Sequence, residues 1–166
     1  MSDANNATYE KVAVLAVCMQ NAERIPFEEH QEYMLEQYRK LLIDCMKIMQ
    51  KNHCRDIILY NNHIYGIYDG NHNKAGRDLE TTGIGINRLV RAFNGNTEEY
   101  FADKLLCGIG IAVGTAIKIS LPNPFGQSRM WMGQVFNKAY SMAQMSICDG
   151  IQRVFIDGTI DMNFFK

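Results

Sequence analysis

The chain has 166 residues, a hydrophobic content of 47% and a formal net charge of −1 from 17 basic and 18 acidic residues. This length and apolar content predict one globular domain with its own core, which we place at residues 10–166. The balanced charge, with no basic block, excludes nucleic-acid binding through a phosphate-tracking patch. No run approaches about 18 apolar residues, so no transmembrane helix is expected. Residues 1–9 are polar and lack the apolar core of a secretory signal, and we expect a flexible lead and a cytoplasmic protein.

Metal and redox motifs are missing from the sequence. The five cysteines are scattered and none forms a C-x-x-C pair, which favours reduced thiols over a zinc site. The four histidines lack a ligand spacing such as H-x-x-x-H. Neither a P-loop nor a G-x-S-x-G nucleophile elbow occurs, so we expect no cofactor.

The first predicted elements are a strand, a long helix and a hairpin. Residues 11–19 form a valine-rich apolar run typical of a buried central strand. Pro26 and the glutamates after it predict a helix start, and apolar residues at helical spacing continue the helix to about Asn52. Residues 56–60 and 64–68 predict paired strands, because the asparagines between them tolerate positive φ.

The later elements are less regular. A helix is expected at 79–93 despite two internal glycines, and the strand that follows at 105–119 is either continuous or a hairpin broken near Gly114. The other expected elements are a loop at 69–76, a helix break at 94–97, a helical turn at 98–104, a proline-containing loop at 121–129, a helix at 135–146 and a closing strand at 154–156, continued or not after Asp157-Gly158. The order is βαββαβ with additions, which predicts a ferredoxin-like α+β domain with helices packed on an antiparallel sheet, as in polymerase palms.

Two motifs in the second half carry a family resemblance. Residues 109–114 read I-G-I-A-V-G, and residues 133–141 read G-Q-V-F-N-K-A-Y-S. This order resembles the class III nucleotidyl cyclases, the adenylyl and guanylyl cyclase family, in which the motifs are I-G-I-x-x-G and G-D-x-V-N-x-A-x-R. The chain keeps the glycines, Asn137 and Ala139. It has Gln134 in place of the motif's Asp and Ser141 in place of the catalytic Arg.

The resemblance extends from about Val12 to Ile156 and implies where the family's metal and base contacts would lie. Cys18 takes the position of the first metal-binding Asp, and Asn61-Asn62 replaces the Gly-Asp pair of the hairpin. Ile58 takes the position of the base-reading Lys and Met130 that of its partner Asp. No acid occurs at 12–22 or 57–68, so a register error of one residue does not restore a carboxylate to either segment.

These replacements have a chemical consequence. A class III cyclase uses two divalent cations to activate the ribose 3′-hydroxyl and hold the pyrophosphate. Magnesium requires hard, anionic oxygen ligands, which the sulfur of Cys18 and the amide of Asn62 do not supply. Ser141 cannot neutralise charge on the phosphate. We therefore expect a catalytically inactive cyclase-like module, a pseudo-cyclase without a metal cofactor.

Three roles remain open from the sequence. The first is a dimerising regulatory module, a homodimer or a heterodimer with a cyclase-like subunit; Trp131 and Met132, with Ile58 and Met130, would lie near its interface, although Trp131 fits the core equally well. The second is a sensor that holds a nucleotide or cyclic nucleotide without metal. The third is an active cyclase with relocated or partner-supplied ligands for magnesium or manganese. The residues expected to line the vestigial cleft are Cys18, Ile58, Asn61, Asn62, Met130, Gln134, Asn137 and Ser141.

Overall fold

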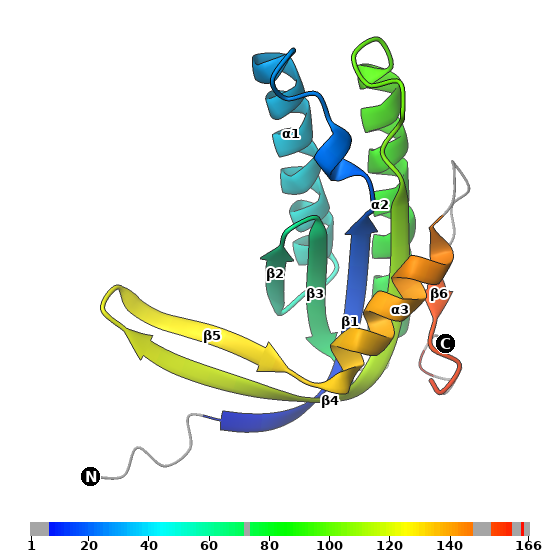
Figure 1. The fold of residues 1–166 in the computed structure, drawn as a ribbon. Coiled ribbons are helices and arrows are strands. Elements are labelled where there is room, and N and C mark those ends of the chain that lie inside the picture. Colours follow the sequence, from blue (N-terminus) through cyan, green and yellow to red (C-terminus); the bar gives the residue numbers. More distant parts are fainter. Residues whose placement is uncertain (1–6, 72–73, 148–153, 161–163, 165–166) are drawn as a thin grey trace.

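Residues 7–71, 74–147, 154–160 and 164 are described by the structure, which is a computed structural model. In these described residues, three α-helices pack on the two faces of a six-stranded sheet (Figure 1). The elements are β1 (Ala7–Met19), the 3-10 helix η1 (Ala22–Arg24), α1 (Gln31–Lys51), β2 (Asp56–Tyr60), β3 (His63–Asp69), α2 (Ala75–Thr97), β4 (Cys107–Asn123), β5 (Gly126–Met132), α3 (Gln134–Ser146) and β6 (Phe155–Ile156).

The strand order β2-β3-β1-β4-β5 confirms the predicted α+β fold, since β4-β1-β3-β2 is the ferredoxin-like arrangement. The pairs along this path are antiparallel. The two-residue β6 departs from the expected antiparallel sheet because it pairs with β4 in parallel, which makes the sheet mixed. Within the described residues no strand continues after β6; residues 158–160 form a turn and a bend instead.

The central strand β1 is buried on both faces, which explains its unbroken apolar sequence. Alternate side chains of a strand point to opposite faces. Leu15 and Val17 join the core under α1 and α2, whereas Val14 and Cys18 join the core under α3. Every residue from Val12 to Met19 is at most 1% exposed.

The sheet lies close to the helices on both faces because glycines line the contacts. Within α2, a Cβ at Gly83 would lie 3.0 Å from the side chain of Ile109 in β4. On the other face, a Cβ at Gly108 or Gly110 would overlap the backbone of α3, at the carbonyl oxygens of Ala143 and Ala139. Gly83 of α2 and Gly108 and Gly110 of β4 therefore serve close packing between the sheet and its helices.

The predicted loop at 121–129 is wrong. β4 runs without a break past Gly114 to Asn123, and β5 begins at Gly126, so the two prolines lie at the tip of a hairpin. The hairpin extends away from the body of the molecule (Figure 1). The two prolines led to the prediction of a loop, because proline cannot donate a hydrogen bond to a β-ladder. Proline is nevertheless tolerated near turns and edge strands, such as the tip of this hairpin.

Two helix boundaries also differ from the prediction. α1 begins at Gln31 instead of Pro26, because residues 27–30 form a turn and a bend. α2 continues through Thr97 instead of breaking at Asn94. The side chain of Asn94 leaves the helix backbone intact and binds Leu105, accepting a hydrogen bond from its N–H at 2.7 Å and donating to its carbonyl at 2.9 Å. Residues 98–104 form turns instead of the expected helical turn.

Three smaller expectations have clear outcomes. β1 already begins at Ala7, inside the lead expected at 1–9, and residues 1–6 lie outside the described residues. Four cysteines of the described chain are free thiols, at positions 18, 45, 54 and 107. Among the described residues, none of the helices has the length and apolar character needed to cross a bilayer.

The contact between β4 and α3 predicts opposite effects for the same substitution at two glycines. Gly110→Ala should lower the free energy of unfolding by at least about 2 kcal/mol, because its methyl group would overlap helix backbone. Gly95→Ala, on an open part of α2, should raise it by about 0.5–1 kcal/mol. Chemical denaturation followed by circular dichroism measures both, and a neutral Gly110→Ala would contradict this packing.

Candidate functional site

The β2–β3 hairpin is fastened to the end of β1. Asn62 donates from Nδ2 to the carbonyl oxygen of Met19 at 2.7 Å, and the N–H of Met19 donates to the carbonyl of Asn62 at 3.0 Å. Asn61 has a φ of 51°, in the left-handed region that asparagine tolerates. The predicted turn therefore forms, and it is tied to the point where the family resemblance places the first metal ligand.

A cavity of about 340 Å³ opens beside this turn and is called the hairpin pocket; its lining residues are Ala22, Glu23, Tyr38, Asn61 and Asn62. The 3-10 helix η1 follows β1 closely and brings Glu23 to the hairpin. Glu23 was not among the residues expected in the cleft, because it lies one residue beyond the acid-free segment 12–22. Its position depends on the chain turning back after β1, which strand periodicity does not reveal.

Cys18 lies outside the hairpin pocket, although it was expected in the same cleft as Asn62. It is 1% exposed and belongs to the core on the α3 face of the sheet. Nε2 of Gln144 donates to its sulfur at 3.1 Å. Burial raises the pKa of the Cys18 thiol; the hydrogen bond from Gln144 opposes this rise, and the negative charge of Glu23 adds to it. A metal would have to displace Gln144 and remove this proton to reach the sulfur.

A second cavity, of about 330 Å³, lies along α3 and is called the α3 pocket. Its lining residues are Gln134, Asn137, Lys138, Ser141, Met142 and Asp157. It brings together the three α3 positions that were expected in the cleft, because they are three and four residues apart on one face of a helix. It also contains a charged pair, Lys138 and Asp157, that was not predicted from the sequence.

The charged pair in the α3 pocket is Lys138 and Asp157, with Nζ and Oδ2 3.7 Å apart. Burial favours a raised pKa for Asp157, but hydrogen bonds from the backbone N–H and hydroxyl of Thr159, together with the charge of Lys138, outweigh it, and the pKa is lowered. Lys138 therefore places a cation on the same helix face as Ser141, where the family motif has its arginine. The signal for Lys138 was its helical spacing, four residues after Gln134 and three before Ser141; the turn that positions Asp157 gave no such signal.

Of the two base-reading positions, that of Ile58 is filled by apolar packing. Ile58 packs against the core under α3, and Trp131 is 9% exposed in the same core. The indole Nε1 of Trp131 donates to Oδ2 of Asp56 at 2.9 Å, and Nζ of Lys118 lies 5.3 Å from the ring centroid. Trp131 is therefore mainly a core residue.

The methionines on either side of Trp131 point outward instead. Met130 is 40% exposed and Met132 is 49% exposed. This alternation follows from the strand, in which neighbouring side chains face opposite sides. Of the two interface residues expected from the sequence, Met132 is placed on the surface and Trp131 is not, while Met130 joins Met132 there.

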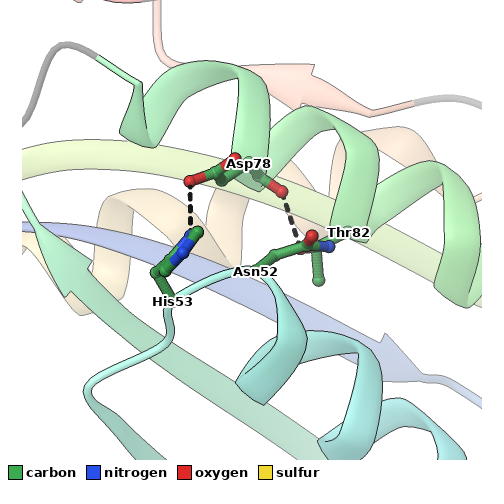
Figure 2. A network of polar contacts seen from close by, with 4 residues as sticks. All are labelled: Asn52, His53, Asp78 and Thr82. Carbon is green, nitrogen blue, oxygen red and sulfur yellow. Dashed lines mark hydrogen bonds and ion pairs between the residues drawn. The ribbon is translucent and has the colours of Figure 1, made fainter.

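A separate polar cluster joins the end of α1 to the start of α2, as Figure 2 shows. Nδ2 of Asn52 donates to the hydroxyl of Thr82 at 2.8 Å, and that hydroxyl donates to the carbonyl of Asp78 at 2.6 Å. Nδ1 of His53 lies 3.0 Å from Oδ2 of Asp78. None of the four residues lines the hairpin pocket or the α3 pocket. The cluster therefore holds α1 and α2 together and is not part of either pocket.

The described residues do not fit the family's two-cation site. They contain no group of three or more histidine, cysteine, aspartate or glutamate side chains arranged to hold a metal. Glu23 is the single carboxylate among the residues that line the hairpin pocket. Two magnesium ions require more anionic oxygens than one carboxylate supplies.

Solved structures similar to this chain are nucleotide cyclases. The guanylyl cyclase Cya2 superimposes with a TM-score of 0.77 at 12% identity, over 96% of this chain and 80% of that one. The adenylyl cyclase CyaB from P. aeruginosa gives 0.72 at 13% identity, over 87% and 76%. This chain has the cyclase catalytic-domain fold. A dimeric guanylyl cyclase domain of the RhoGC fusion protein from the aquatic fungus Blastocladiella emersonii gives 0.67 at 14%, over 86% and 78%.

The comparisons with sequences are negative. No protein-family model matches this chain, and no curated protein matches it. The resemblance to class III cyclases is therefore carried by the fold, together with the few motif residues that the chain retains.

The burial of Cys18 predicts the result of restoring the family's acid. Cys18→Asp should lower the free energy of unfolding by about 3 kcal/mol or more, because the carboxylate would be buried on the apolar α3 face. Cys18→Ala, the control for loss of the thiol, should cost about 1 kcal/mol. Thermal unfolding with and without manganese measures both. Stabilisation of Cys18→Asp by manganese would contradict the placement of this residue away from the hairpin pocket.

Proposed function

We propose that this chain is a catalytically inactive cyclase-like module that forms a dimer and regulates a partner or senses a nucleotide or cyclic nucleotide. The observation that carries the proposal is the environment of Cys18. At the position of the first metal-binding Asp there is a buried thiol, hydrogen-bonded to Gln144 and integrated into the core. The partner in the dimer is a second copy or a cyclase-like subunit.

The chemistry of the other positions supports the same proposal. Asn62 is committed to the carbonyl of Met19 through its amide nitrogen, which leaves one neutral side-chain oxygen for a ligand. The hydroxyl of Ser141 has no charge with which to offset the negative charge on a phosphate in the transition state. No step of cyclisation is therefore assigned to these residues, and the proposed module requires no metal.

The sensing role is supported by uncommitted polar groups. Gln134, Asn137 and Ser141 line the α3 pocket, and their side chains make no hydrogen bond to other described residues. Asn61 faces the hairpin pocket. Amides and hydroxyls both donate and accept hydrogen bonds, as the edges of a nucleobase and a ribose require. Recognition by such groups does not depend on a divalent cation.

Calorimetry in the presence of a chelator tests the sensing role. We expect at least one nucleoside triphosphate or cyclic nucleotide to bind without metal, and Asn137→Ala to weaken that binding about tenfold, the effect of losing about 1.4 kcal/mol of hydrogen bonding. Gln50→Ala, an exposed amide on α1 outside both pockets, is the matched control and should bind as the wild type does. If none of the nucleotides gives a heat of binding, the proposed sensing role is wrong.

A second candidate is an active nucleotidyl cyclase with relocated ligands. Two observations favour it: the carboxylate of Glu23 lines the hairpin pocket, and Lys138 supplies a cation beside Asn137. A partner subunit with intact carboxylates would add the missing metal ligands. This candidate requires magnesium or manganese.

Incubation of the purified protein with each of the four nucleoside triphosphates and magnesium or manganese separates the two candidates. We expect no cyclic product by liquid chromatography and mass spectrometry. If a cyclic product forms, is lost in both Glu23→Gln and Asn137→Ala, and is retained in the surface control Glu36→Gln, the chain is an active cyclase and the proposal of an inactive module is wrong.

A further inference from the structure

The hairpin pocket contains an acid without a partner. Glu23 is exposed, and its carboxylate forms neither a hydrogen bond nor an ion pair within the described part of the chain. The cation next to it in sequence is directed elsewhere, since Nη1 of Arg24 lies 3.8 Å from Oδ2 of Asp103. The residues that line the pocket include no lysine, arginine or histidine. The pocket therefore holds a negative charge that its own lining does not balance.

The two asparagines of the β2–β3 turn add neutral acceptors to this charge. Nδ2 of Asn62 is used in its hydrogen bond to Met19, so Oδ1 is the part of the amide that is left for a ligand. The side chain of Asn61 forms no hydrogen bond with other described residues. Together with Glu23, the pocket offers three side chains with oxygen acceptors. A primary ammonium group has three N–H donors and no acceptor, which matches such a set.

The rest of the lining is uncharged and suits the hydrocarbon part of an amine. The ring of Tyr38 is held edge-to-face by Phe27 and Phe93, with ring centroids 5.7 and 6.2 Å away. Burial raises the pKa of the Tyr38 phenol, and Cys45 adds to the rise, so this side chain lines the pocket as a neutral aromatic. Aromatic rings attract organic cations, and Ala22 adds apolar surface for methylene groups.

The size and charge of the hairpin pocket favour a small organic cation over a metal ion. Its volume of about 340 Å³ lies near the lower end of the range for small-molecule sites, about 300–1,000 Å³, so a short amine fits it. Magnesium holds a near-octahedral shell and loses water reluctantly, and one carboxylate does not replace that shell. An ammonium ion balances the charge of Glu23 with its own single charge and forms a charge-assisted hydrogen bond with it.

We propose that the hairpin pocket binds a primary alkylammonium ion, with Glu23 as its counter-ion and the free amide oxygens of Asn61 and Asn62 as further acceptors. The ring of Tyr38 covers the alkyl chain. This ligand is independent of a nucleotide in the α3 pocket and requires no second subunit. The ammonium group belongs either to a free small amine or to the lysine side chain of another protein, and both present the same chemistry to the pocket.

Titration of the full chain with butylammonium, followed by ¹H–¹⁵N nuclear magnetic resonance with chelator present, tests the site. We expect saturable shifts of the backbone amides of Glu23, Asn61 and Asn62. Glu23→Gln should weaken binding at least about tenfold, because a charge-assisted hydrogen bond is lost. Asn61→Gly, which keeps the left-handed turn at φ 51°, should weaken it about threefold. A parallel titration with Nα-acetyl-lysine amide identifies the source: tighter binding than butylammonium assigns the site to a lysine side chain, and weaker binding assigns it to a free amine.

Two controls separate a cation site from general attraction to an acidic surface. Glu28→Gln removes the same charge from an exposed acid outside the pocket and should bind butylammonium as the wild type does. Neutral 1-butanol, with the same chain length, should bind at least about tenfold more weakly than the amine. Equal binding of 1-butanol, unchanged binding by Glu23→Gln or absence of saturable shifts refutes the proposal. Without chelator, displacement of the amine by an equal concentration of magnesium also refutes it, because the pocket would then prefer a metal. The same spectra report whether each variant is folded.

Discussion

Burial of β1 on both faces is the constraint from which the other features of this fold follow. An element covered by α1 and α2 on one side and by α3 on the other must present apolar side chains to both. The close approach of α3, which Gly108 and Gly110 permit, seals the face that contains Cys18. A carboxylate at that position would lose its hydration without gaining a cation or a sufficient set of donors. The packing around Cys18 is therefore incompatible with a charged metal ligand at that position.

The framework was predictable from the sequence because its signals are local. The apolar run of β1, the helical spacing in α1 and the asparagines of the hairpin turn all led to the observed elements. β5 was missed because Pro122, Pro124 and Gly126 indicate a loop, whereas its strand character comes from pairing with a long β4. Similarly, Asn94 indicates a break in α2 until its distant partner, Leu105, is known.

The candidate site was predictable only in part, for the same reason. The replacements at Cys18, Asn62 and Ser141 follow from motif order along the chain. Motif order does not show that Cys18 turns away from the hairpin, because the direction of a strand side chain depends on the sheet around it. The contributions of Glu23 and Lys138 arise from a turn of η1 and from the exposed face of α3. They are charges near the family's positions, supplied by residues outside its motifs.

The loss of the family's metal ligands changes how charge is balanced in the pockets of this chain. In a metal-dependent cleft, cations and phosphates neutralise the charges that two subunits bring together. A cleft without those cations has to balance charge by other means. In the α3 pocket, Lys138 and Asp157 provide such a balance directly between protein side chains, with Nζ and Oδ2 3.7 Å apart.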